Sequence, residues 1–125
     1  MNVSKKILIV DDNPFIIVTA RAIFEDAGFE VFAANSGEEC IAFLEKNNFK
    51  GVVLMDLMMP VMDGWETINK IMEKGLNENI IISVLSAKEV PIEKPKEMDF
   101  IADYFNKPFN ADKIIEKINS YFVYE

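Results

Sequence analysis

Short apolar runs alternate with amphipathic stretches along the chain, and this alternation predicts the order of the secondary structure. Four runs hold four to six mostly aliphatic or β-branched residues, and a fifth, Tyr104-Phe105, is shorter. Runs of this kind are typical of strands buried on both faces of a parallel sheet. The first four runs cover residues 7–10, 31–34, 52–55 and 80–85. The pattern therefore predicts five parallel strands.

The stretches between these runs carry helix signals. Asn13 can cap a helix that has Pro14 at its first position and ends at Gly28. A capping-box sequence opens a second helix over residues 36–48, and Asn110 can cap a last helix. Each predicted helix repeats its apolar residues at helical spacing, so each should pack one face on the sheet.

Strand and helix alternate five times, so right-handed crossovers should place helices on both faces of one sheet. The predicted class is α/β: a doubly wound, five-stranded parallel sheet with five helices, in one domain over residues 1–125. Pro91 and Pro95 should shorten or distort the fourth helix, which we expect within residues 89–102. In such sheets, ligands bind outside the carboxyl ends of the strands, where the strand order reverses.

Composition and charge narrow the function. The formal net charge of −8 disfavours binding to nucleic acid or to anionic lipid by this chain alone. The absence of histidine excludes His-based triads, zinc-hydrolase sites and a histidine autokinase. Cys40 is the only cysteine, so no intramolecular disulfide can form, and we expect a buried, inert thiol. The first apolar run is too short for a signal peptide or a membrane span, so we expect a cytoplasmic protein.

Candidate chemistry gathers at the expected carboxyl ends of the strands. The polar residues that follow strands one, three, four and five are Asp11, Asp12, Asp56, Ser86 and Lys107. Carboxylates ~5 Å apart repel each other by roughly 3 kcal/mol at an effective dielectric of about 20, so a cation should compensate them. An all-oxygen cluster favours Mg²⁺ or Mn²⁺, because Ca²⁺ prefers more ligands. A metal ion, an ammonium and a hydroxyl together are what a phosphoryl group in transfer requires.

The same residues resemble a known family. The chain carries Asp11-Asp12-Asn13, then MDLMMPVMDG over residues 55–64, then Leu85-Ser86-Ala87, and finally Lys107-Pro108-Phe109. The interval from Asp12 to Asp56 is 44 residues, from Asp56 to Ser86 it is 30, and from Ser86 to Lys107 it is 21. Over essentially its whole length the chain is similar to the receiver domain of a two-component response regulator, of the chemotaxis-regulator type. The resemblance implies a flavodoxin-like fold with strand order 2-1-3-4-5.

The resemblance also implies a phosphoacceptor and a metal site. Asp56 would be the nucleophile that takes a phosphoryl group from the phosphohistidine of a sensor histidine kinase or a histidine phosphotransfer protein. Mg²⁺, for which Mn²⁺ can substitute, would be bound directly by Asp12 and mostly through water by Asp11. Asp56 and the backbone carbonyl of Met58 would complete the protein ligands.

Further residues would bind the phosphoryl group and respond to it. By the resemblance, Lys107 would pair with Asp56 and then with the phosphoryl oxygens, and a cis bond before Pro108 would aim it inward. Ser86 would bind another phosphoryl oxygen, and its movement would make room for Tyr104 at the switch position. The surface around the fourth helix, fifth strand and fifth helix would then bind a downstream target, whose identity the sequence leaves open. Such a domain is no turnover enzyme, although it helps catalyse its own phosphorylation and dephosphorylation.

Two questions stay open: whether the function depends on phosphorylation, and whether the first helix carries a docking surface. The alternative function is a receiver-like interaction module that works without phosphorylation, and the intact Asp12, Asp56 and Lys107 argue against it. An aspartyl-phosphate phosphatase would need an acidic residue two positions after the nucleophile, where Met58 stands.

The first predicted helix is more apolar than its core contacts require. Phe15, Ile17 and Val18 either form a docking surface for a helical phosphodonor or pack in the core.

Overall fold

Five strands form one parallel sheet. The computed structural model describes residues 5–87, 101–107 and 110–122. The sheet has the order β2-β1-β3-β4-β5, so the predicted doubly wound fold and its strand order are confirmed. The strands are β1 (Lys6–Val10), β2 (Glu30–Ala34), β3 (Gly51–Met55), β4 (Ile80–Ser86) and β5 (Ile101–Asn106).

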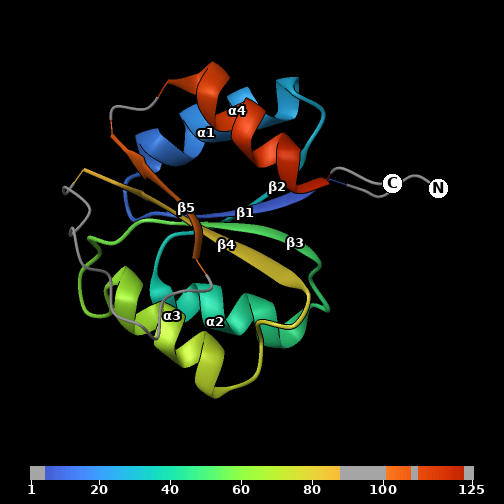
Figure 1. Ribbon diagram of the computed structural model, residues 1–125. Coiled ribbons are helices and arrows are strands. Elements are labelled where there is room, and N and C mark those ends of the chain that lie inside the picture. The colour runs from blue at the N-terminus through green and yellow to red at the C-terminus, as the bar shows by residue number, and fades with distance from the viewer. Residues whose placement is uncertain (1–4, 88–100, 108–109, 123–125) are drawn as a thin grey trace.

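Helices cover both faces of this sheet (Figure 1). Helices α1 and α4 lie on one face, and α2 and α3 lie on the other. Their bounds are α1 (Pro14–Asp26), α2 (Gly37–Lys46), α3 (Gly64–Glu73) and α4 (Ala111–Asn119), and the 3-10 helix η2 (Ser120–Phe122) follows α4. Among the described residues, no helix is both long enough and apolar enough to cross a membrane.

One predicted boundary is wrong. The fourth helix was expected within residues 89–102, and most of that range lies outside the described residues. Its last two residues, Ile101 and Ala102, belong to strand β5. Ile101 pairs with Ile82 and is buried, so a β-branched side chain extends the strand beyond the expected Tyr104-Phe105.

The predicted caps form as expected. The side-chain oxygens of Asn13, Ser36 and Asn110 each accept a hydrogen bond from a backbone amide two or three residues later. Helix α3 has a full capping box between Asp63 and Glu66. These caps fix where each helix begins, and for α1 that point lies just after Asp11 and Asp12 at the end of β1.

Two apolar clusters sandwich the sheet. Successive residues of β1 point to opposite faces, so Ile7 joins the cluster under α1 and α4 while Leu8 joins the cluster under α2 and α3. This double burial explains why the strand sequences are continuously apolar. Cys40 is buried in the second cluster, and burial raises the pKa of its thiol to about 12, as the prediction of an inert thiol requires.

Candidate functional site

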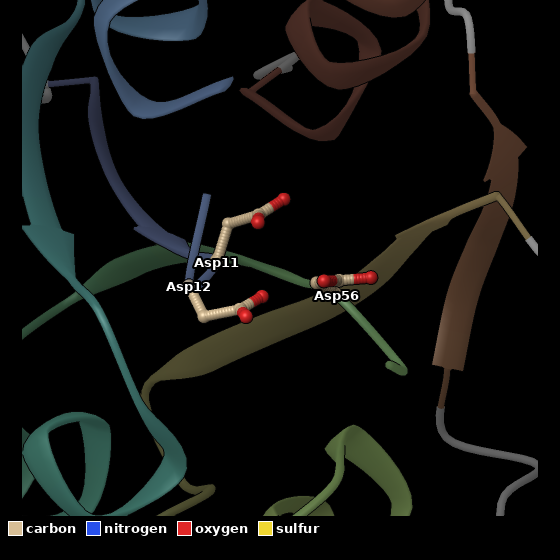
Figure 2. A group of neighbouring side chains, drawn as sticks. All are labelled: Asp11, Asp12 and Asp56. Atoms are coloured by element: carbon tan, nitrogen blue, oxygen red, sulfur yellow. The ribbon is translucent and has the colours of Figure 1, made fainter. Parts of the chain in front are cut away.

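The acidic residues leave two neighbouring strands at the same level. Val10 and Met55 are paired across β1 and β3, and the next residues are Asp11 and Asp56. The Asp56 amide donates to the Val10 carbonyl at 2.9 Å, which continues the strand ladder to the aspartate itself. Figure 2 shows the side chains of Asp11, Asp12 and Asp56 side by side at this edge.

The three carboxylates form a cluster of mixed exposure. One oxygen from each lies within 4.8 Å of the others. Asp11 and Asp56 are only 2% and 4% exposed, whereas Asp12 is exposed. The cluster therefore has a buried base and one member open to water. Two buried negative charges at this separation are costly unless a cation lies beside them.

Lys107 supplies a positive charge to this cluster from β5. Its Nζ lies 2.7 Å from Asp11 Oδ2 and 3.6 Å from Asp56 Oδ2, and its side chain is 16% exposed. The expected contact with Asp56 is thus present, and the shorter contact is to Asp11. The lysine reaches across β4, to which its backbone is attached by a hydrogen bond from its amide to the Ser86 carbonyl at 2.9 Å.

The surroundings of Asp56 raise the pKa of its carboxyl above that of a free side chain. Burial raises the pKa of its carboxyl from 3.8 to about 6, and the negative charge of Asp11 acts in the same direction. The backbone amide of Met58, which donates to Asp56 Oδ1 at 3.2 Å, lowers this pKa, as does the ammonium of Lys107. The cluster thus holds more negative charge than its own lysine neutralises.

The acidic oxygens suit a small, hard divalent cation. Mg²⁺ binds oxygen ligands at about 2.0–2.1 Å and usually takes only one or two carboxylates, keeping several waters. Three carboxylate oxygens within 4.8 Å of one another are close to that arrangement, and the exposed Asp12 leaves room for water. The residues present therefore could bind a divalent metal ion. The role of the Met58 carbonyl stays a prediction.

Ser86 and Tyr104 lie where the sequence predicted. Ser86 ends β4, is fully buried, and is paired with Asn106 across β4 and β5. Tyr104 is half-buried against the cluster under α2 and α3, and its ring lies 6.4 Å from the ring of Trp65, centroid to centroid. Trp65 belongs to α3. No sequence pattern pointed to its contact with Tyr104, because the two residues are 39 positions apart.

The loop between β3 and α3 is held very close to Asp56. A Cβ on Gly64 would lie 2.4 Å from the Asp56 carbonyl oxygen, so only glycine fits there. Val61 has a φ of 69° and is 90% exposed, a strained conformation for a β-branched residue. The predicted cis bond before Pro108 lies outside the described residues.

Comparison with known proteins agrees with this geometry. The chain matches the Response regulator receiver domain family over residues 7–119. It belongs to this family. Receiver domains are the phosphoacceptor signalling domains of response regulators, so this is the function of the chain.

Relatives of this receiver domain occur alone and in longer proteins. It is 31% identical to Sporulation initiation phosphotransferase F of Bacillus subtilis, with 94% of each chain covered. It spans about half the length of several longer curated relatives.

Solved structures show the same fold. A CheY-like receiver domain from Methanospirillum hungatei has a TM-score of 0.86 at 40% identity, covering 94% of this chain and 93% of that one. The response regulator TrrA of Thermotoga maritima, in complex with Mg²⁺-BeF, has a TM-score of 0.80 at 28% identity, covering 93% and 97%.

A groove lies beside the acidic cluster of this receiver domain, between α1 and the turn after β2. It has a volume of about 440 Å³. Val18 lines it and is 67% exposed, and Phe15 nearby on α1 is 79% exposed. Ile17 is half-buried and packs on the cluster under α1 and α4. Of the three apolar residues of α1, Phe15 and Val18 are therefore surface residues, whereas Ile17 both packs on the core and lines the groove.

Proposed function

We propose that Asp56 receives a phosphoryl group from the phosphohistidine of a partner protein. A carboxylate oxygen of Asp56 attacks phosphorus, the P–N bond breaks, and the imidazole leaves after taking up a proton. The observation that carries this proposal is the convergence of Asp11, Asp12, Asp56 and Lys107 at one edge of the sheet, from three strands.

The acidic cluster supports Mg²⁺ as the metal. Asp11, Asp12 and Asp56 would hold it, and when bound it would neutralise charge on the transferring phosphoryl group. Mn²⁺ has the same preference for oxygen ligands and would substitute. The structure of TrrA in complex with Mg²⁺-BeF, a protein of the same fold at 28% identity, supports this choice.

The hydrogen bonds of the site orient the nucleophile. The Met58 amide holds Oδ1 of Asp56, while Oδ2 lies 3.6 Å from the Lys107 ammonium. An oxygen of an incoming phosphoryl group at this place would lie within reach of that ammonium, which is shared with Asp11. Lys107 would thus neutralise the negative charge that develops in the transition state.

Ser86 and Tyr104 would convert the modification into a change of surface. Ser86 is buried at the end of β4, beside the strand that carries both Tyr104 and Lys107. Attraction of its hydroxyl to the phosphoryl group would favour a packing in which Tyr104 moves, and the contact with Trp65 would change with it. The downstream target would bind the surface that changes.

The partner would be a histidine kinase or a histidine phosphotransfer protein. Among the described residues, four of the five exposed large apolar side chains follow the ends of β1 and β3: Phe15, Val18, Met58 and Val61. Val18 lines a groove together with Asp11 and Asp12, and the Met58 amide donates to Asp56, so a helical donor with an apolar surface could approach Asp56 there. A module that acts without phosphorylation would not need the cluster.

Mass spectrometry tests the proposal. Purified protein is incubated with Mg²⁺ and a small phosphodonor, and its intact mass is compared with that of Asp56→Asn and of Asp112→Asn, an exposed aspartate of α4. We expect one added phosphoryl group in the wild type and in Asp112→Asn, none in Asp56→Asn, and none when Mg²⁺ is chelated. Equal modification of Asp56→Asn would refute the assignment of the phosphoacceptor.

A further inference from the structure

Tyr121 belongs to the 3-10 helix η2, and its hydroxyl contacts side chains of both β4 and β5. Tyr121 Oη donates a hydrogen bond to Asp103 Oδ2 of β5 at 2.5 Å and lies 2.7 Å from Ser83 Oγ of β4. Because the tyrosine proton is directed to the carboxylate, the Ser83 hydroxyl is the donor to Tyr121. Ser83 is fully buried, whereas Asp103 and Tyr121 are half-buried, so these three side chains form a polar bridge that runs from the interior toward the surface. Asp103 Oδ1 also lies 3.9 Å from Lys117 Nζ of α4. The hydroxyl of the buried Ser83 has Tyr121 as its hydrogen-bond partner, and leaving a buried polar group without a partner is costly.

The polar bridge stands at an irregularity in the pairing of β4 with β5. Ile82 is paired with Ile101, but the next residue, Ser83, is paired with Asp103. Ala102 is therefore an extra residue on β5, and its side chain is exposed. Such a bulge changes which residues of the strand point to each face.

The bulge determines where the aromatic residues of β5 point. In the observed register Tyr104 is opposite Val84, and both lie in the cluster under α2 and α3. Phe105 is opposite Leu85, and both lie in the cluster under α1 and α4. Without the extra residue, Tyr104 would be opposite Leu85 and would point to the other face.

The sequence of β5 by itself specifies this register weakly. Two adjacent aromatic residues fit either apolar cluster, and β5 is an edge strand with a neighbour on one side only. Asp103 is different, because in the other register its carboxylate would be opposite Val84, in an apolar cluster. The polar bridge is thus the contact that distinguishes the two registers.

We propose that Tyr121 is a positioning residue that fixes the register of β5 and thereby places Tyr104 and Lys107. Lys107 follows β5 directly, and its Nζ lies 2.7 Å from Asp11. A slip of one residue would move the strand by about 3.3 Å, which would break the contact between Lys107 and Asp11. The importance of Lys107 for phosphoryl transfer rests on the proposed function, whereas the register claim does not.

Native-state amide exchange tests the register claim. The variants are Tyr121→Phe, which keeps the ring, and Ser83→Ala, which removes the other hydroxyl. Ser120→Ala is the matched control, because its hydroxyl is exposed on the same turn and bonds only to the Lys117 carbonyl among the described residues. NMR follows the amides of residues 103–107, including the Lys107 amide that donates to Ser86.

We expect these amides to exchange about tenfold faster in Tyr121→Phe than in the wild type, as the loss of a hydrogen bond to a charged group suggests. Their exchange in Ser120→Ala should be slower than in Tyr121→Phe. The double variant Tyr121→Phe/Ser83→Ala should add little to Tyr121→Phe alone, because both changes break one bridge. Exchange in Tyr121→Phe within twofold of Ser120→Ala would overturn the proposal. If Tyr121→Phe did not fold, Ser83→Ala against Ser120→Ala would decide by the same criterion.

Measurements of Mg²⁺ affinity and of the phosphorylation rate distinguish a positioning role of Tyr121 from a general loss of stability. Mg²⁺ affinity should not fall in Tyr121→Phe, because the three aspartates follow β1 and β3, and a displaced Lys107 would only remove a competing cation from Asp11. Phosphorylation by a small phosphodonor should slow about fivefold or more, because Lys107 is displaced. Equal losses of Mg²⁺ affinity and of rate would contradict the positioning role. A wild type that takes no phosphoryl group would refute the proposed function, and the exchange result would still decide the register claim.

Discussion

The raised pKa of Asp56 leads to a prediction about stability. In the folded protein this carboxyl has a pKa of about 6 against 3.8 for the free side chain. Between these two values the folded state holds a proton that the unfolded chain has released. Unfolding therefore releases a proton, and the free energy of unfolding should fall as the pH rises from about 4 to about 6. Above that range the loss is complete.

The size of the effect follows from the same two values. A rise from 3.8 to about 6 corresponds to on the order of 3 kcal/mol of lost stability at pH 8. Asp56 is only 4% exposed, so solvent screens little of this. Asp56→Asn removes the charge and can keep the hydrogen bond from the Met58 amide. We therefore expect Asp56→Asn to be more stable than the wild type at pH 8, by up to about 3 kcal/mol, and equal to it near pH 4.

Urea denaturation in the presence of a chelator measures this difference between pH 4 and pH 8. Asp26→Asn, at the exposed end of α1, is the control for the loss of one negative charge. Saturating Mg²⁺ at pH 8 should then stabilise the wild type more than Asp56→Asn, because a bound cation offsets the repulsion between the Asp56 carboxylate and the other two carboxylates. If the difference between Asp56→Asn and the wild type is constant with pH, or if the wild type is the more stable protein at pH 8, the pKa of Asp56 does not cause the loss of stability.

Three further predictions concern the loop after β3 and the core. Gly64→Ala should lower the free energy of unfolding by about 1–3 kcal/mol in urea denaturation, because its Cβ would meet the Asp56 carbonyl 2.4 Å away; an unchanged stability would contradict the close packing. Val61→Asn should raise the free energy of unfolding by about 1 kcal/mol, since asparagine tolerates the left-handed φ of 69° better than valine does, and a loss of stability would show that Val61 is not strained. Cys40 should react with a thiol reagent only on unfolding, because burial raises the pKa of its thiol to about 12; rapid labelling of the native protein would contradict this.

Much of the site could be predicted because it is encoded where strands end. Each of Asp11, Asp56 and Ser86 stands at or directly after an apolar run, and parallel strands bring their carboxyl ends to one edge. The position of each residue in a run thus already gives its position in space. The helix caps were predictable for a similar reason, since a cap acts on amides two or three residues away.

Contacts between distant segments were not predictable in this way. No pattern in the chain indicated that Lys107 would lie closer to Asp11 than to Asp56, or that Trp65 would contact Tyr104. Which of two such contacts is the shorter depends on small differences in distance between side chains that separate strands and helices carry. The raised pKa of Asp56 is of the same kind, because burial is its largest cause.

The chain by itself determined the order of the elements, the class of the fold and the edge at which the chemistry gathers, because these follow from local periodicity and from the rules of parallel sheets. Three features became visible only in the folded chain: the bulge at Ala102, the polar bridge through Tyr121 and the faces to which Tyr104 and Phe105 point. Two adjacent aromatic residues satisfy either face, so a contact from the far end of the chain is needed to choose between them.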